Sequence, residues 1–351
     1  MIALPSHPRV DSAIDEAVAR VVSRAHLLGP GFGALGDAVA RATQGGKRFR
    51  PALVSASFDA FGGDRERSPG LYSVAAAFEL LHTAFVVHDD VIDHDTERRG
   101  VPNVAGEFRA RAREREADAA GAALLGDAAA ILAGDLLLHE ALRLVALADV
   151  DPVARERLHA LVDDAVYVSA AGELADVENS VVKAQASTAD AFDAAFNKTA
   201  VYSFRAPLEA GAVLAGASSA AIEVIQTAGG QLGLAFQLVD DLIGAFGTAE
   251  QAGRASGGDL RESKRTPLVA LARETASWSR VSDALAVAHT GPIAVRKAQA
   301  ALERSGAPTR LRAVIGSTLE QVRTASLDPS LPPAAGELLR DIADGMERRI
   351  P

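Results

Sequence analysis

The spacing of apolar residues is the feature of this sequence that most constrains its fold. Within residues 9–28, Ile14, Val18, Val21 and Val22 recur at the i, i+4, i+7 and i+8 positions that form one face of an α-helix. Comparable patterns predict further helices over 49–61, 69–95, 127–148, 152–175, 188–216, 219–247, 265–275, 280–290, 292–304, 308–325 and 334–349. No convincing strand alternation or Asn-Gly hairpin interrupts the series, so we predict an all-α fold.

Composition and two helix starts favour the same fold. Ala, Leu and Val dominate the 351 residues, and aromatic residues make up only 5% of them. Ala and Leu lose little side-chain entropy in a helix, so this mix favours helices over strands. Asp151-Pro152 places proline at a first helical position, and Ser187 with Asp190 resembles a capping box. Both signals indicate where helices begin.

Two stretches between the predicted helices are rich in glycine and charged residues. We predict that residues 99–126 and 247–264 are loops for this reason. No linker is long enough to require a domain boundary, so we expect residues 1–351 to form a single domain, a bundle of long helices. The predicted helices between residues 152 and 247 carry few charges, which suits the middle of one helical core.

Composition also excludes several classes of chemistry and partner. The sequence contains no cysteine, which excludes disulfides, thiolate catalysis and Cys-ligated zinc. Any metal must therefore be held by oxygen or imidazole, and carboxylates suit Mg²⁺. The formal net charge of −10 argues against nucleic acid as a partner. We find no apolar run of about 18 residues and no signal peptide, so we expect no integral membrane segment and a cytoplasmic location.

The first group of residues suited to chemistry is acidic. Asp89, Asp90 and Asp93 follow an apolar segment that starts at Leu80. On a helix, Asp89 and Asp93 lie one turn apart on a single face, where like charges repel unless cations bridge them. This pattern predicts a magnesium site, although a solvated acidic helix end would contain the same residues.

A second acidic pair, Asp240 and Asp241, follows Gln237 near the end of the predicted helix over 219–247. The stretch after this helix adds four charged residues: Arg254, Asp259, Lys264 and Arg265. A single acidic cluster can be a surface accident, but two clusters at the ends of apolar helices indicate a site. Two facing carboxylate clusters can hold several Mg²⁺ ions around one diphosphate.

Basic residues occur in three short segments that suit phosphate binding. The first is GGKRFRP at 45–51, where glycines let the backbone approach an anion and Lys47 and Arg50 lie one turn apart. The other two are Arg98-Arg99-Gly100 and Lys198-Thr199. Each segment alone is equally typical of a helix-capping loop or a solvated surface.

Taken together, these residues resemble the trans-isoprenyl diphosphate synthase (polyprenyl synthetase) family, most closely its short-chain type such as geranylgeranyl diphosphate synthase. The matching segments are GGKRFRP, ELLHTAFVVHDDVIDHDTERRG, AGD at 133–135, NKT at 197–199, and FQLVDD followed by GGDLRESKRTPL. They occur in the family's order and cover about residues 40–275. The resemblance implies an all-α fold in which two aspartate-rich helices face each other across a central active-site cavity.

The resemblance also implies roles for individual residues. Asp89 and Asp93 would ligate two Mg²⁺ ions and Asp240 a third. The residues implied to bind the allylic diphosphate are Arg98, Lys198, Thr199, Gln237, Arg254 and Lys264. Those implied to bind isopentenyl diphosphate are Lys47, Arg50, His82 and Arg99. The implied catalytic residues are Asp89, Asp93, Arg98, Lys198, Asp240 and Lys264. His82 lies two helical turns before Asp89, which fits this role, although such a histidine is more often a core residue.

The implied activity is condensation of an allylic diphosphate with isopentenyl diphosphate by a magnesium-dependent homodimer, giving a short-chain all-trans product. The alternatives are a farnesyl diphosphate synthase, a class I terpene cyclase and a non-catalytic partner subunit of a heteromeric synthase. A cyclase binds one diphosphate and would not need Lys47, Arg50 and Arg99. A non-catalytic subunit would have lost part of the first acidic cluster, which is complete here.

Product length and two departures from the family pattern complete the predictions. The resemblance implies that bulky residues four or five positions before the first aspartate limit the growing chain. Phe85 is bulky and Ala84 is small, so we favour the C20 product over C15; the alternative for Phe85 is a core position. Gly244 replaces the usual third aspartate of the second acidic cluster, and Arg254 replaces a usual lysine.

Overall fold

The computed structural model describes residues 7–182, 186–252 and 256–351. The α-helices are α1 (Pro8–Leu27), α2 (Pro30–Ala42), α3 (Phe49–Ala60), α4 (Gly70–Ile92), α5 (Val104–Arg113), α6 (Ala119–Ala146), α7 (Pro152–Val181), α8 (Thr188–Ala195), α9 (Ala206–Leu214), α10 (Ser219–Phe246), α11 (Ala249–Ala252), α12 (Gly258–Arg261), α13 (Pro267–Arg273), α14 (Trp278–Ala286), α15 (Pro292–Ser305), α16 (Ala307–Ala325) and α17 (Pro333–Glu347). A π-helical segment, η1 (Phe196–Arg205), joins α8 to α9, and a 3-10 turn, η2 (Ala288–Thr290), follows α14. The two-residue strands β1 (Glu97–Arg98) and β2 (Val101–Pro102) form an antiparallel hairpin.

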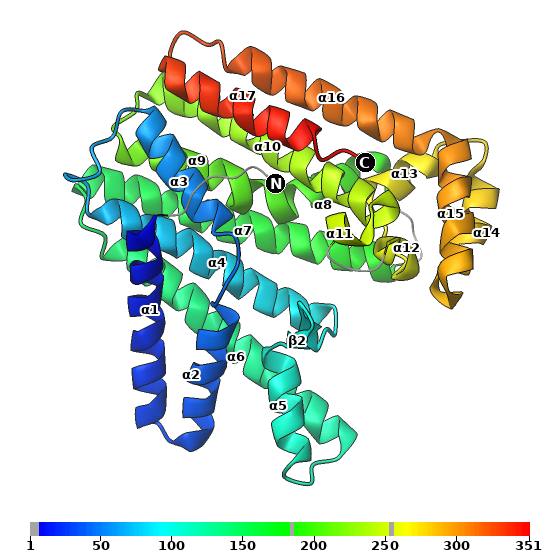
Figure 1. The fold of residues 1–351 in the computed structure, drawn as a ribbon, viewed down its shortest axis with the longest axis horizontal. Coiled ribbons are helices and arrows are strands. Elements are labelled where there is room, and N and C mark those ends of the chain that lie inside the picture. The colour runs from blue at the N-terminus through cyan, green and yellow to red at the C-terminus, as the bar shows by residue number, and fades with distance from the viewer. Residues whose placement is uncertain (1–6, 183–185, 253–255) are drawn as a thin grey trace.

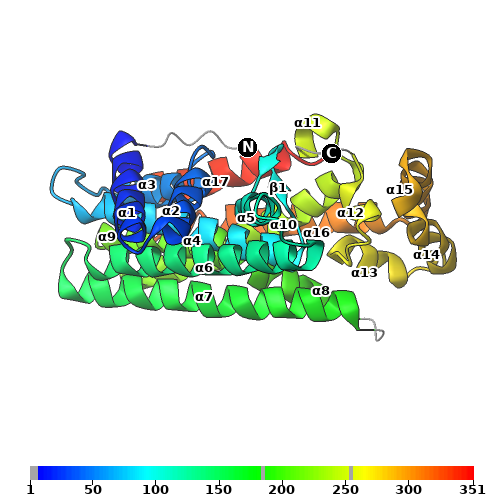
Figure 2. The ribbon, with the colours of Figure 1, turned by 90° about the horizontal axis from the view of Figure 1, so that it is seen from below.

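The long helices lie side by side along the length of the molecule, which confirms the predicted all-α fold (Figure 1). The α1–α2 pair lies at one end and the α14–α15 pair at the other, in both views (Figures 1 and 2). α6 and α7 pack against each other along one face of the bundle (Figure 2). The C-terminal helices α16 and α17 cover α10 (Figure 1).

Two clusters of buried apolar residues hold the bundle together. The first centres on α4, with side chains from α1, α6 and α7, and the second centres on α10, with side chains from α13 and α15 to α17. The π-helical segment η1 contributes Val201 to the first cluster and Phe204 to the second. The segment η1 therefore lies between α4 and α10, the two helices that carry the acidic clusters. Short π-helical segments are frequent at functional sites.

Both helix starts predicted from sequence are present. The carboxylate of Asp151 accepts hydrogen bonds from the first backbone N–H groups of α7, and Pro152 occupies the first helical turn. Ser187 and Asp190 form a reciprocal capping box at the start of α8. Such a cap contributes about 1 kcal/mol to the stability of its helix.

The prediction of a loop over residues 99–126 was wrong, because this stretch contains β2, α5 and the start of α6. Asn103 and Asp118 cap the two helices, since their side chains accept from backbone N–H groups three residues later. α5 buries Val104, Phe108 and Ala112, spaced four residues apart, and packs on α6. We predicted a loop because this stretch is rich in glycine and arginine, and we did not recognise the apolar face of α5.

Three further segments differ from the sequence prediction. α2 was not predicted, because its glycine-rich sequence weakens the helical pattern. The single helix predicted over 188–216 is divided into α8, η1 and α9. The loop predicted over 247–264 contains the short helices α11 and α12. These differences leave the predicted order of the long helices unchanged.

Two described helices, α4 and α6, are long and apolar enough to cross a membrane by length and composition alone. In α4, 78% of the apolar stretch is buried inside the bundle, as in the core helix of a water-soluble protein. In α6 the buried share is 39%, because one side of this helix is exposed. The sequence analysis predicted helices over 69–95 and 127–148 but did not identify these two apolar stretches within them.

Candidate active site

The first acidic cluster lies at the C-terminal end of α4. The N–H of Asp93 donates to the carbonyl oxygen of Asp89 at 2.8 Å, so these residues lie one turn apart, as predicted. Asp90 is buried and accepts a 2.9 Å hydrogen bond from Nε of Arg98. Burial raises the pKa of Asp90, and Arg98 partly offsets this. Asp90 therefore anchors Arg98, while Asp89 and Asp93 are more exposed and lie beside Arg98 and Lys264, respectively.

Lys198 lies where η1 closely approaches α7. Gly172 permits this approach, since a Cβ there would lie 2.2 Å from the backbone nitrogen of Lys198. Nζ of Lys198 lies 3.3 Å from Asp89, 3.1 Å from Glu173 and 3.0 Å from Asp176. Burial lowers the pKa of Lys198, but the three carboxylates outweigh burial and hold this pKa above its ordinary value. One cation thus faces three carboxylates, which leaves excess negative charge.

The segment after α10 reaches the first acidic cluster. Nζ of Lys264 lies 3.9 Å from Oδ2 of Asp93 and 3.4 Å from Glu262. Burial and the nearby Asp89 raise the pKa of Asp93, and Lys264 opposes this shift. The structure therefore brings Lys264 to the carboxylates with which it was predicted to act.

The second acidic cluster lies in the last third of α10. Oδ1 of Asp240 accepts a 2.6 Å hydrogen bond from Arg349, which follows α17 and whose guanidinium lies 4.8 Å from the ring centre of Phe236. Burial raises the pKa of Asp240, and Arg349 opposes this. Burial raises the pKa of Asp241 to about 8, with Asp259 and Asp240 adding to the shift.

Thr199 and Gln237 connect η1 to the second acidic cluster. The hydroxyl of Thr199 donates to Oε1 of Gln237 at 2.8 Å, and Nε2 of Gln237 donates to Oδ1 of Asp241 at 2.9 Å. Oδ2 of Asp241 is buried and has no hydrogen-bond partner among the described residues. Thr199 and Gln237 therefore position α10 against η1.

Arg50 and Arg99, two of the residues predicted to bind isopentenyl diphosphate, lie near the half-buried His82. Burial lowers the pKa of His82 well below its ordinary value, and Arg50, Arg98 and Arg99 lower it further. The imidazole is therefore neutral at pH 7. Arg99 lies against the backbone of Gly45 and Gly46, within 4 Å of where their Cβ atoms would be. Lys47 is exposed in the same loop.

Tyr202 of η1 links the basic residues to the predicted chain-length position. The guanidinium of Arg50 lies 4.9 Å from the centre of the Tyr202 ring and donates to the Ser203 hydroxyl at 2.7 Å. The rings of His82 and Tyr202 stack at 6.0 Å, and the Phe85 ring meets Tyr202 edge-on at 5.0 Å. Ala84, next to Phe85, is fully buried in the core.

The residues present fit magnesium, although the described part of the chain contains no ready-made group of three or more metal-binding side chains. Mg²⁺ is commonly held by one or two carboxylates together with substrate phosphates and water. Separated pairs such as Asp89 with Asp93 and Asp240 with Asp241 match that mode. The unpartnered Oδ2 of Asp241 is a further hard oxygen beside the second pair.

Several site residues were missed by the sequence reading. Glu173, Asp176, Tyr202 and Arg349 reach the site through packing of α7, η1 and the end of α17. The i, i+3 spacing of Glu173 and Asp176 on an apolar helix was the one signal for them in the sequence. Arg254 lies outside the described residues.

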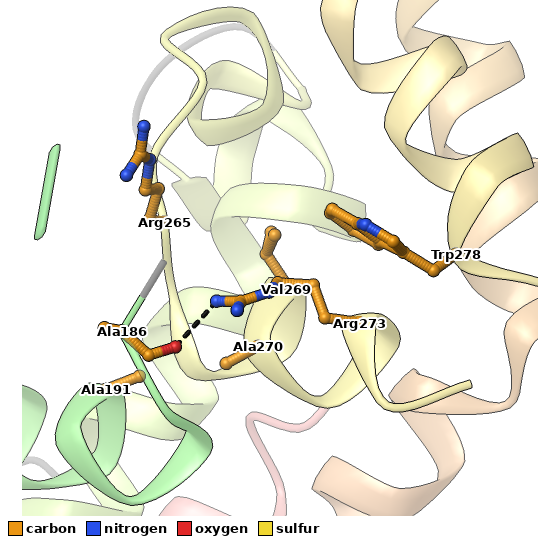
Figure 3. A pocket seen from close by; sticks show the side chains of 7 residues that line it. All are labelled: Ala186, Ala191, Arg265, Val269, Ala270, Arg273 and Trp278. Atoms are coloured by element: carbon orange, nitrogen blue, oxygen red, sulfur yellow. Dashed lines mark hydrogen bonds between the residues drawn. The ribbon is translucent and has the colours of Figure 1, made fainter. Parts of the chain in front are cut away.

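The pocket in Figure 3 is a separate feature. It is lined by Ala186, Ala191, Arg265, Val269, Ala270, Arg273 and Trp278, of which only Arg265 was named in the sequence analysis, as a charged residue after the second acidic cluster. Arg273 crosses it and donates to the carbonyl oxygen of Ala186 at 2.7 Å (Figure 3). This arginine fastens α13 to the segment before α8, which is a structural role.

Comparison with known proteins agrees with this geometry. A geranylgeranyl diphosphate synthase from Sulfolobus acidocaldarius is 34% identical over 232 residues, or 65% of this chain and 63% of that protein. A short chain isoprenyl diphosphate synthase from Methanothermobacter thermautotrophicus is 32% identical over 81% of this chain and 79% of that protein. The aligned part thus spans slightly less than two thirds of the first relative and more than two thirds of the second.

The most informative solved structure is a geranylgeranyl pyrophosphate synthase from Corynebacterium glutamicum, complexed with isoprenyl diphosphate and magnesium. It superposes with a TM-score of 0.87 at 26% identity, and the match covers 97% of both chains. Residues 34–303 match the polyprenyl synthetase family, which confirms the resemblance seen in the sequence. This chain therefore belongs to the polyprenyl synthetase family.

Proposed function

We propose that this chain is a magnesium-dependent trans-prenyltransferase. It condenses an allylic prenyl diphosphate with isopentenyl diphosphate and makes a short-chain all-trans product, geranylgeranyl diphosphate (C20). The observation that carries the proposal is the meeting of two oppositely charged clusters at the end of α4. The acidic cluster surrounds Lys198, the basic cluster surrounds His82, and Arg98 belongs to both.

The acidic cluster suits the allylic diphosphate. Asp89, Asp93 and Asp240 would hold three magnesium ions, which supply positive charge for the departing diphosphate when bound. Lys198 stays protonated because its pKa is raised, so its ammonium group can donate to diphosphate oxygens throughout turnover. Lys264 is placed to do the same beside Asp93. This arrangement favours ionisation to an allylic cation.

The basic cluster suits the second diphosphate. Arg50 and Arg99 present guanidinium groups, and the glycines at 45–46 leave room for an anion beside Arg99. Lys47 adds an exposed cation. The double bond of isopentenyl diphosphate attacks the allylic cation, and the released diphosphate takes the proton that is then lost. The aromatic rings of Tyr202 and Phe85 help to keep water from the cation.

The proposal is tested by incubating the purified chain with labelled isopentenyl diphosphate, each allylic primer in turn, and Mg²⁺. We expect label in a C20 diphosphate and loss of turnover after complete chelation. Asp89→Ala should lower kcat by about 10²–10³-fold, whereas Asp283→Ala on exposed α14 should not. Primer turnover without label would indicate a cyclase, and no turnover by the chain alone would indicate a partner subunit.

A homodimer in the cytoplasm, with residues 1–351 as one domain, completes the proposal. One side of α6 exposes apolar side chains, including Leu124, Leu125, Ile131 and Leu132. Tyr167 and Leu174 are exposed on the neighbouring helix α7. α6 and α7 lie together on one face of the bundle (Figure 2). An apolar patch of this kind suits association with a second copy of the chain.

A further inference from the structure

We propose that Asp259, from α12, supplies the carboxylate that Gly244 cannot supply to the second acidic cluster. The inference rests on the proposed function, because it assigns Asp259 to the cation that Asp240 would hold. Gly244 lies one helical turn after Asp240, on the same face of α10. An aspartate at this position would add a carboxylate to that face.

The space beside Gly244 is already filled by a carboxylate. A Cβ on Gly244 would lie 1.7 Å from Oδ2 and 2.5 Å from Cγ of Asp259. Since such contacts below 3.0 Å do not occur, any side chain at position 244 must displace Asp259. The carboxylate of Asp259 thus occupies the place where the side chain of residue 244 would begin.

The segment around α12 holds Asp259 in this place. Gly257 adopts a left-handed conformation with φ of +70° immediately before α12, and α12 packs on α10. The carbonyl oxygen of Asp259 accepts from the N–H of Lys264 at 3.0 Å. The same turn therefore fixes Asp259 against α10 and brings Lys264 to Asp93. Asp259 is 8% exposed.

A second observation indicates that this cluster is built for a cation. Asp241 is 5% exposed, and its Oδ2 has no hydrogen-bond partner among the described residues. Asp259 acts electrostatically on both Asp240 and Asp241. Asp259 of α12 thus lies near Asp240 and Asp241 of α10, and one of the oxygens in this cluster, Oδ2 of Asp241, is buried without a partner among the described residues. The three side chains do not form a ready-made metal-binding group by themselves. Asp259 would therefore supply the missing carboxylate oxygen beside a divalent cation at Asp240.

The experiment counts bound ions directly. Mn²⁺ is titrated into the metal-free chain with inorganic pyrophosphate and followed by electron paramagnetic resonance, and the Mg²⁺ dependence of turnover is measured in parallel. Gly244→Ala and the isosteric Asp259→Asn should each lose one bound ion and raise the half-saturating Mg²⁺ concentration by about 10–100-fold. Gly316→Ala in α16, where an added Cβ meets no atom within 4 Å, is the matched control.

An exchange variant separates the assigned role from simple damage. Gly244→Asp combined with Asp259→Gly moves the carboxylate from α12 to α10 and should restore the lost ion. An unchanged ion count in Asp259→Asn, or no recovery in the exchange variant, would overturn the inference. A wild-type chain that binds ions with pyrophosphate but incorporates no isopentenyl diphosphate would instead overturn the proposed function.

Discussion

At the scale of single residues, we propose that the two diphosphate substrates bind at two clusters of opposite charge. Arg50 belongs to the basic cluster and Lys264 to the acidic one. Arg50→Ala should raise KM for isopentenyl diphosphate by about tenfold or more, since a hydrogen bond to a charged group is worth about 1.5–3 kcal/mol. Lys47→Ala should act in the same direction, and Lys264→Ala should raise KM for the allylic partner instead. Steady-state kinetics with each substrate varied in turn checks this, with the exposed Arg67→Ala as control. Equal effects on both substrates would contradict the assignment.

His82 gives a second prediction at this scale, because burial and three arginines lower its pKa. Below about pH 6.5 the unfolded chain binds a proton at this residue and the folded chain does not. The contribution of neutral His82 to the free energy of unfolding is therefore fully present above that pH. It decreases as the pH falls, by up to about 1.4 kcal/mol per pH unit. His82→Gln should reduce the loss of melting temperature between pH 7 and pH 5. The exposed His139→Gln should not, and equal pH profiles for wild type and His82→Gln would refute the prediction.

At the scale of elements, we propose that α4 and η1 together limit how far a growing chain can extend. Phe85 lies one turn before Asp89 and its ring meets Tyr202 of η1, so we expect it to block a chain that extends along α4. Phe85→Ala should therefore give products longer than C20, which chromatography of the dephosphorylated alcohols would reveal. Phe58→Ala, in the fully buried core of α3, serves as the comparison for simple loss of packing. An unchanged product at lower yield in Phe85→Ala would make this ring part of the core.

The sequence predicted the helices that have a clear apolar periodicity. It did not predict the elements and site residues that are defined by packing against distant parts of the chain. The long helices and their caps at Asp151 and Ser187 follow from local patterns. α5 was missed because its apolar face is short, and only its packing on α6 shows that this face is buried. Tyr202 and Arg349 were missed because partners that are distant in sequence, Arg50 and Asp240, give them their roles.

At the scale of the whole molecule, the exposed apolar side of α6 predicts the state of assembly. Light scattering should give twice the 36.3 kDa mass of one chain. Leu132→Asp, half exposed on α6, should shift the protein towards the single-chain mass, because burying a charge without a partner is costly. Leu327→Asp, which is 74% exposed beyond α16, should leave the mass unchanged. A wild-type protein of single-chain mass would contradict the proposed dimer.

The ion pair between Arg349 and Asp240 couples the end of α17 to the site by thermodynamic linkage. The guanidinium of Arg349 donates to Oδ1 of Asp240, so the divalent cation that we propose at Asp240 would compete with Arg349 for this carboxylate oxygen. If the cation displaces Arg349, the segment after α17 loses the stabilisation that this ion pair provides. By reciprocity, any contact that fastens that segment more tightly must weaken cation binding by the same factor. Occupancy of the site and mobility of the C-terminal segment should therefore rise and fall together.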